Sequence, residues 1–313
     1  MTSIITDNEL RKALRQEAEL MHADTARYLV DAYYQMQTMR IMMEGRERAQ
    51  EQGVDRNPGR FISITADFFM SAEKEIQAWL DRFSGNNELG QWAREQKGIG
   101  PVLAAGLLAH IDFDRTTCVS SVWSFAGLNP AAVWEKKTKR PHNAALKVLC
   151  WKIGESFVKT KSRDGAFYGQ LYTQRSQHEW AKNLKGEYAH LRGGRRYTYK
   201  PSTASYKWMQ AYYKGVELDG TTREPILVGK TVKATAKMSE EERIAAGGII
   251  MIPPQAIHGR SRRYAVKMFL SHFWQVGYEI KYGKPAPNAY VLEHGGHVHK
   301  IDPPGWKPLQ NAA

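Results

Sequence analysis

The residues that could carry out chemistry in this 313-residue chain form two small groups of metal-binding type. Asp112 and Asp114 flank Phe113 and could hold a cation for hydrolysis of nucleic acid, although a polar loop or a helix cap is the simpler explanation. Three histidines near the C-terminus lie in a glycine-containing segment without the helix or cysteine partner of a zinc site, which favours ordinary surface or phosphate-facing histidines. These are His294, His297 and His299.

No other catalytic constellation is recognisable. The only two cysteines, Cys118 and Cys150, exclude a disulfide scaffold and a four-cysteine zinc site. No phosphate-binding P-loop or dinucleotide fingerprint occurs. We therefore expect no cofactor, with Mg²⁺ to be considered only if the protein is an enzyme, and the catalytic question stays open.

A glycine-containing segment, Gln96–Ile111 (QKGIGPVLAAGLLAHI), is the most informative motif. Gly98 and Gly100 are predicted to form a tight turn with backbone conformations open only to glycine, and Pro101 suits the first turn of the next helix. Such a helix-hairpin-helix points backbone N–H groups at a phosphate without reading base sequence, although a helical hairpin without a ligand is the alternative. The residues expected at the phosphate are Lys97, Gly98, Ile99, Gly100 and Val102.

The residues after this hairpin narrow the class of protein. The run Phe125-Ala126-Gly127-Leu128-Asn129-Pro130 follows a short predicted helix and precedes a basic loop and a further predicted helix over 143–159. This order resembles the C-terminal domain of the serine-dependent insertion-sequence transposases that carry a helix-hairpin-helix and are known for RNA-guided recombination. The resemblance covers residues 92–160 and implies nucleic-acid binding and an origin in a mobile element or a phage.

The chain departs from that family in two places. The family's Ser-Gly pair carries the nucleophile, but the corresponding positions here read AAVWEK over 131–136, and the nearest hydroxyl, on Thr138, has nothing to activate it. The family also has an N-terminal RNase H-like domain with paired acidic residues, whereas residues 1–90 are predicted to be wholly helical. The resemblance therefore implies nucleic-acid binding better than it implies strand transfer.

Positive charge is concentrated after the first third of the chain. The whole sequence has 45 Lys and Arg against 32 Asp and Glu, a net charge of +13. Residues 1–90 hold 11 basic and 15 acidic residues, a net of −4, so residues 91–313 carry +17. Within 135–215 the cations alternate with aromatic residues, which suits phosphate contact and base stacking, although a solvated lysine-rich surface is the simpler alternative.

Three basic clusters are expected to extend the phosphate contacts of the hairpin. They follow the family-like turn, lie in the Gly- and Tyr-rich region, and stand at the start of the last predicted helix. The residues are Lys136, Lys137, Lys139 and Arg140, then Arg192, Arg195 and Arg196, and finally Arg260, Arg262 and Arg263.

The spacing of apolar residues predicts the helices and strands that must position these groups. Residues 7–48 are predicted to form one long helix and 62–83 a second, so that the two make an antiparallel hairpin or an arm that pairs with another copy. Residues 186–260 are predicted to be irregular, with a small hairpin or two from runs such as 196–199 and 249–252 and a short helix at 238–243. Residues 259–282 are predicted to form an amphipathic helix, and the Pro-rich tail an extended segment.

We expect a mostly α fold in four segments. These are a helical hairpin or coiled-coil arm (1–87), a helix-hairpin-helix nucleic-acid-binding domain (88–185), a small irregular α+β insertion (186–260), and a C-terminal helix with a Pro-rich tail (261–313). No apolar run reaches the ~18 residues of a membrane span, and the first residues lack the apolar core of a signal peptide. We therefore expect a cytoplasmic protein without a membrane partner.

The leading hypothesis is a DNA-binding protein that grips the phosphate backbone and assembles as a homo-oligomer through its N-terminal helices. RNA is an alternative partner, because basic loops and aromatic residues serve single strands equally well. A divergent transposase, recombinase or nuclease, acting by strand transfer or hydrolysis, is a second hypothesis. A third is an oligomeric interaction protein that binds an acidic partner.

Overall fold

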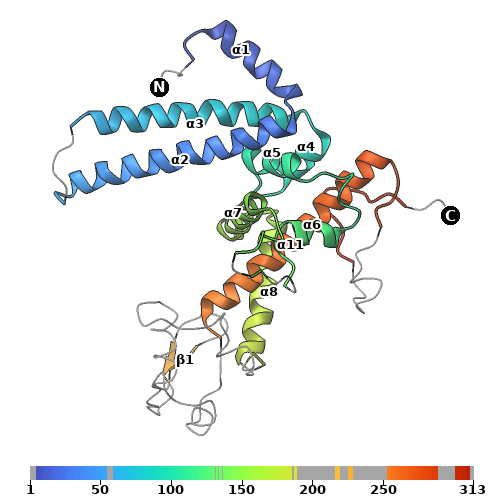
Figure 1. Ribbon diagram of the computed structural model, residues 1–313. Coiled ribbons are helices and arrows are strands. Elements are labelled where there is room, and N and C mark those ends of the chain that lie inside the picture. Colours follow the sequence, from blue (N-terminus) through green and yellow to red (C-terminus); the bar gives the residue numbers. More distant parts are fainter. Residues whose placement is uncertain are drawn as a thin grey trace. The chain divides into compact units, whose positions relative to one another are not determined.

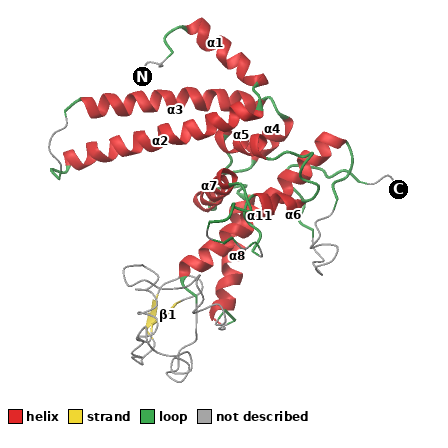
Figure 2. Ribbon diagram, in the orientation of Figure 1, coloured by secondary structure: helices red, strands yellow, loops and turns green. Residues whose placement is uncertain are grey.

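The protein is mostly helical, as Figure 2 shows. The computed structural model describes residues 5–54, 59–130, 132, 134, 135, 137–184, 187, 188, 216–218, 225–227, 252–287 and 300–310. Its contacts divide the chain into two compact units, residues 1–156 with 267–313 and residues 157–266. Helices α7 (Ala144–Thr160) and α11 (Pro254–Tyr282) each continue from one unit into the other.

Two long antiparallel helices form an arm, α2 (Ala23–Glu51) and α3 (Phe61–Gly85), and lie side by side (Figure 1). Their ion pair between Arg40 and Glu73 and the hydrogen bond from Ser63 to Glu47 show the opposite chain directions. The predicted helix over 62–83 and the hairpin are thus confirmed.

The prediction of one helix over 7–48 is wrong. The segment is divided into α1 (Asn8–Glu17), a 3-10 turn (Ala18–Leu20) and α2, because the backbone becomes extended at Met21 and His22. The Nδ1 atom of His22 then accepts a hydrogen bond from the N–H of Asp24 and caps the start of α2. Apolar spacing continues across this break, so periodicity alone does not reveal it.

The base of the arm shares a core with the glycine hairpin. Ala26 and Val30 of α2 and Leu80 of α3 pack in one cluster with Val102 and Ala105 of α5 (Pro101–His110). The predicted boundary between residues 87 and 88 therefore does not separate two bodies, since both sides bury the same apolar cluster. The helix before the hairpin is α4 (Glu88–Glu95).

The C-terminal half of α11 is the apolar centre of the first unit, where Phe269, Phe273 and Trp274 are fully buried. Phe269 stacks on Trp92 of α4, and the indole N–H of Trp274 donates to the carbonyl of Thr116 at 2.9 Å, just before α6 (Val119–Phe125). The helix begins at Pro254, five residues earlier than predicted, because proline is well suited to a first turn.

The tail over 300–310 is extended and packs on helices, as predicted. The ring of His272 bonds to the carbonyl of Ile301 at 2.8 Å, and the indole N–H of Trp306 donates to Glu279 at 2.7 Å. Among the described residues, no helix is both long and apolar enough to cross a bilayer.

The second unit contains α8 (Phe167–Leu184), the start of α11 and a two-stranded antiparallel sheet, β1 (Val216–Leu218) with β2 (Pro225–Leu227). In the register of this sheet Val216 is the backbone partner of Leu227. This short hairpin lies within 186–260 but at residues that the sequence analysis did not single out, and α8 belongs to the same unit as that region rather than to the unit of the glycine hairpin. The runs over 196–199 and 249–251 and the short helix over 238–243 lie outside the described residues.

Candidate nucleic-acid interface

The glycine hairpin forms a tight turn between α4 and α5. The N–H of Ile99 donates to the carbonyl of Gln96 at 2.9 Å and closes the turn. Gly98 has φ +104°, a conformation that only glycine adopts readily. The prediction for this glycine is confirmed by its backbone angle.

Gly100 differs from the prediction, because its backbone is in an ordinary extended conformation, φ −95° and ψ 177°. A Cβ atom added there would meet no heavy atom within 4 Å. What glycine provides at this position is therefore open space next to the backbone, the condition for close approach of a ligand, and not a special turn angle.

The start of α5 has the properties of an anion site. Gly100 is its N-cap and supplies no side chain to accept a hydrogen bond from the first turn. The N–H groups of Val102 and Leu103 belong to this turn, where no carbonyl of the helix itself can face them. The helix dipole adds a partial positive charge at the same point, and Lys97 is exposed three residues before the N-cap.

Two residues stabilise the turn from within the protein, Ile99 and Ser156. Ile99 is buried and its N–H is used within the turn, so it holds the hairpin together and has no donor for phosphate. Ser156 of α7, which the sequence did not single out, donates its hydroxyl to the carbonyl of Gly98 at 2.6 Å. The two residues are 58 positions apart, so no local pattern could have revealed this support.

The basic loop before α7 presents its described cations to solvent. Lys137, Lys139 and Arg140 are exposed, whereas Lys136 lies outside the described residues. Lys137 has φ +73°, an unusual angle for a residue with a side chain.

The other predicted basic clusters contribute less. Arg260 bonds to the buried carboxylate of Glu179 at 2.6 Å and lies over the ring of Tyr188, so its charge is compensated inside the second unit. Arg260 is therefore engaged within the protein and is not available as a phosphate contact. Arg262 is half-buried and Arg263 is exposed in the next turn of α11. Arg192, Arg195 and Arg196 lie outside the described residues.

The acidic pair after the hairpin is part of a loop. The side chain of Asp112 accepts the N–H of Asp114, and Asp114 accepts the hydroxyl of Tyr282 at 2.9 Å and pairs with Lys281. The hydrogen bond from Lys281 holds the pKa of Asp114 below its ordinary value. Among the described residues, no three His, Cys, Asp or Glu side chains gather as a metal site would require, and His294, His297 and His299 lie outside that part.

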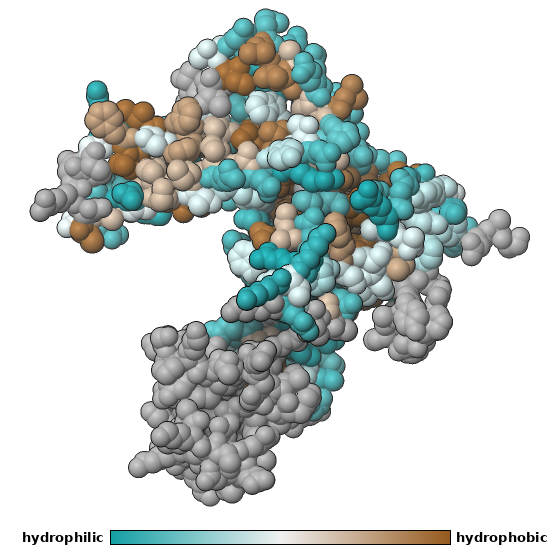
Figure 3. Space-filling model, in the orientation of Figure 1, coloured by the Kyte–Doolittle hydropathy of each residue, from teal (hydrophilic) through white to brown (hydrophobic). Residues whose placement is uncertain are grey.

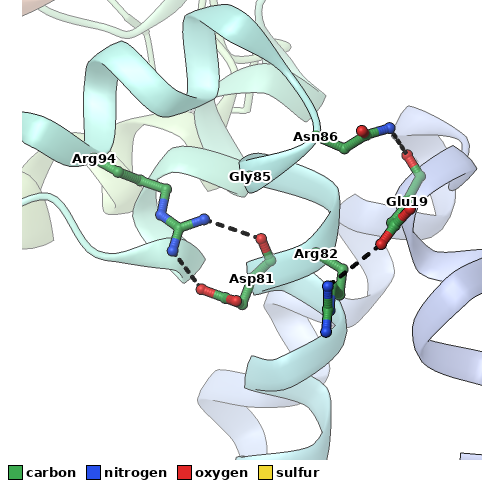
Figure 4. Close-up of a pocket in the computed structure, with 6 residues that line it drawn as sticks. All are labelled: Glu19, Asp81, Arg82, Gly85, Asn86 and Arg94. Atoms are coloured by element: carbon green, nitrogen blue, oxygen red, sulfur yellow. Dashed lines mark hydrogen bonds and ion pairs between the residues drawn. The ribbon is translucent and has the colours of Figure 1, made fainter. Parts of the chain in front are cut away.

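A pocket beside the end of α3 carries no ligand chemistry of its own. Figure 4 shows that its charges pair with one another, Arg94 with Asp81 and Arg82 with Glu19. Asn86 donates to the carbonyl of Glu19 at 3.1 Å. The pocket therefore lies where α3, α4 and the 3-10 turn meet. Each charged side chain that lines it is already paired with another lining residue.

Comparison of the chain with protein-family models, curated proteins and solved structures finds no match.

Proposed function

We propose that this protein binds DNA by contacting the phosphate backbone at the N-terminus of α5. The observation that supports this proposal most directly is the open, uncapped start of that helix at Gly100, which is shaped for close approach of an anion. The cations at Lys97 and in the basic loop would add contacts to neighbouring phosphates. A DNA-binding role agrees with the cytoplasmic location expected from the sequence.

The resemblance of residues 92–160 to the helix-hairpin-helix transposases supports an origin in a mobile element or a phage. We propose binding and not strand transfer, because the family's serine is absent and Asp112 and Asp114 are engaged in loop contacts. Cleavage or joining of DNA in the presence of Mg²⁺ would favour the alternative of a divergent recombinase or nuclease.

We further propose that the arm pairs with a second copy of the chain. Phe61, Ile64 and Phe68 follow one another at helical spacing on α3 and are 73%, 56% and 58% exposed. Figure 3 shows apolar side chains gathered along the arm. An exposed stripe of this kind is typical of a helix that packs against a partner.

The substitution Gly100→Asp separates the role of the hairpin in binding from its role in folding. An aspartate at the N-cap accepts the first-turn N–H groups and stabilises α5, but it places a negative charge where the phosphate would lie. We expect at least about tenfold weaker binding to a labelled duplex, and a thermal unfolding midpoint equal to or above that of the wild type. Binding would be measured by fluorescence anisotropy over a salt series, since phosphate contacts make affinity fall steeply with salt.

A matched control is Gly45→Asp on the arm, where an added Cβ also meets nothing within 4 Å. It adds the same charge away from the hairpin and should leave affinity within about twofold. Unchanged binding by the Gly100→Asp variant would refute the assigned role of the hairpin. A wild-type protein that binds no DNA would refute the proposed function itself.

A further inference from the structure

The basic loop holds a tryptophan in a fixed, half-exposed position. Trp134 is 49% exposed, and its indole N–H donates to the carbonyl of Thr138 at 2.9 Å. Thr138 is itself held by Glu135, whose carbonyl accepts the N–H of Thr138 at 3.2 Å and its hydroxyl at 2.8 Å. The one polar group of the indole is thus used inside the loop, and the ring's remaining exposed surface is apolar.

One cation lies against this ring and two more are exposed in the same loop. The guanidinium of Arg140 lies 5.4 Å from the ring centroid, within cation–π distance, and Lys137 and Lys139 are exposed within a few residues of Trp134 in the chain. Lys137 sits between Trp134 and Thr138 with φ +73°, a conformation that costs a residue with a side chain about 1 kcal/mol or more. Backbone strain of this kind often occurs where a loop is shaped to hold a ligand.

A partner for this loop must offer a flat apolar face together with negative charge. An acidic peptide would satisfy the lysines but would leave the indole exposed. The bases in an intact duplex are stacked on one another and offer no free face. An unpaired base on a phosphate backbone offers both features, because bases stack on tryptophan irrespective of their sequence while cations contact the flanking phosphates.

We propose that Trp134 is a stacking platform for an unpaired base, so that the substrate is DNA containing a single-stranded or splayed nucleotide. This inference rests on the proposed DNA-binding function and names the class of DNA. Arg140 supports one part of the ring, Lys137 and Lys139 contact phosphates on either side, and the base covers the exposed indole.

The test uses the full-length chain and two labelled duplexes of equal length, one intact and one with a short single-stranded gap. Trp134→Ala should weaken binding to the gapped DNA by about tenfold. It should change binding to the intact duplex less than about twofold. Trp134→Phe, which keeps an aromatic ring, should restore most of the lost affinity. Tyr28→Ala removes another exposed aromatic side chain, 76% exposed on α2, and should change neither affinity.

A third DNA, with abasic sites in the gap, has the same charge but nothing to stack. The wild type should bind it about as weakly as Trp134→Ala binds the gapped DNA, and the variant should lose nothing further on it. Equal losses of Trp134→Ala on intact and gapped DNA, or tight wild-type binding to the abasic gap, would overturn the stacking role while leaving the proposed function standing. A wild type that binds none of the three DNAs would overturn both.

Discussion

Glu179 and His272 are buried polar residues whose pKa values are shifted by their surroundings in opposite ways, Glu179 by its hydrogen-bond partners and His272 by burial. Glu179 is fully buried and accepts hydrogen bonds from Arg175, Tyr188 and Arg260. Burial raises its pKa, but the bonds from Tyr188 and Arg260 outweigh burial and hold the pKa below its ordinary value. His272 is buried beneath the C-terminal tail, and burial lowers its pKa to about 4. A carboxylate therefore stays charged in the second unit and an imidazole stays neutral in the first.

His272 should make stability depend on pH. Its pKa in the folded protein is about 4, below the ordinary 6.5, so the unfolded chain takes up the proton first as the pH falls. We expect stability to decline below about pH 6.5, by about 2 kcal/mol between pH 7 and pH 5. In His272→Gln, which can still donate to the carbonyl of Ile301, urea unfolding at both pH values should show that much less difference. An equal pH dependence in the two proteins would contradict the assignment.

Glu179→Gln tests the buried carboxylate. The substitution leaves Arg175 and Arg260 without their shared anion in a buried site, and breaking such a pair typically costs about 3 kcal/mol. Urea unfolding at neutral pH measures the loss. Glu187→Gln is the matched control, because Glu187 pairs with Lys182 at 3.4 Å on the surface and its loss should cost less than about 1 kcal/mol. Similar losses in both variants would mean that the buried cluster adds nothing special to stability.

At the scale of elements, the arm formed by α2 and α3 has two apolar surfaces, one that packs on α5 and one that is exposed. Near its base, α2 and α3 bury Ala26, Val30 and Leu80 against α5 and so fix the hairpin turn. Along α3 farther from that base, Phe61 and Phe68 remain more than half exposed. The sequence pattern of α3 is apolar in both places, and only the neighbouring element decides which apolar residues are covered.

The exposed stripe of α3 should drive self-association. Replacing Phe61 and Phe68 together with serine removes its two aromatic side chains without touching the buried cluster at the base. We expect the variant to sediment as a monomer at concentrations where the wild type is an oligomer, with an unchanged helical circular dichroism signal. Leu20→Ser, at a residue 87% exposed in the 3-10 turn, should not alter the oligomeric state. A wild type that is monomeric at all concentrations would refute pairing through the arm.

At the scale of the whole molecule, charge and glycine geometry indicate the same class of partner. The first 90 residues carry a net charge of −4 and the remainder +17. In the proposed function that excess would provide a long-range attraction to a polyanion, and the turn at Gly98 and Gly100 would add a local contact with phosphate. Removal of the contact should therefore weaken binding without abolishing the salt-dependent attraction.

Much of the fold was predictable from local pattern. Apolar spacing predicted α3 and most of α11, and the glycines predicted the turn between α4 and α5, because each depends on neighbours within a few residues. The break at Met21 was not predictable by spacing, since α1 and α2 keep apolar residues on both sides of it. The packing of α5 against α2 joins residues more than seventy positions apart, such as Val30 and Val102, and periodicity does not specify such partners.

The candidate site, like the fold, was predictable from the sequence only in part. The sequence by itself determined the glycine hairpin, the basic loop and the uneven charge, because residue type and order are sufficient for these. Only the tertiary structure decided that Gly100 has open space beside it, that Ile99 and Arg260 are used internally, that Ser156 supports the turn, and that Trp134 is held half-exposed in the basic loop. These roles depend on which groups meet across long stretches of chain, and burial and hydrogen bonding are settled only when the chain has folded.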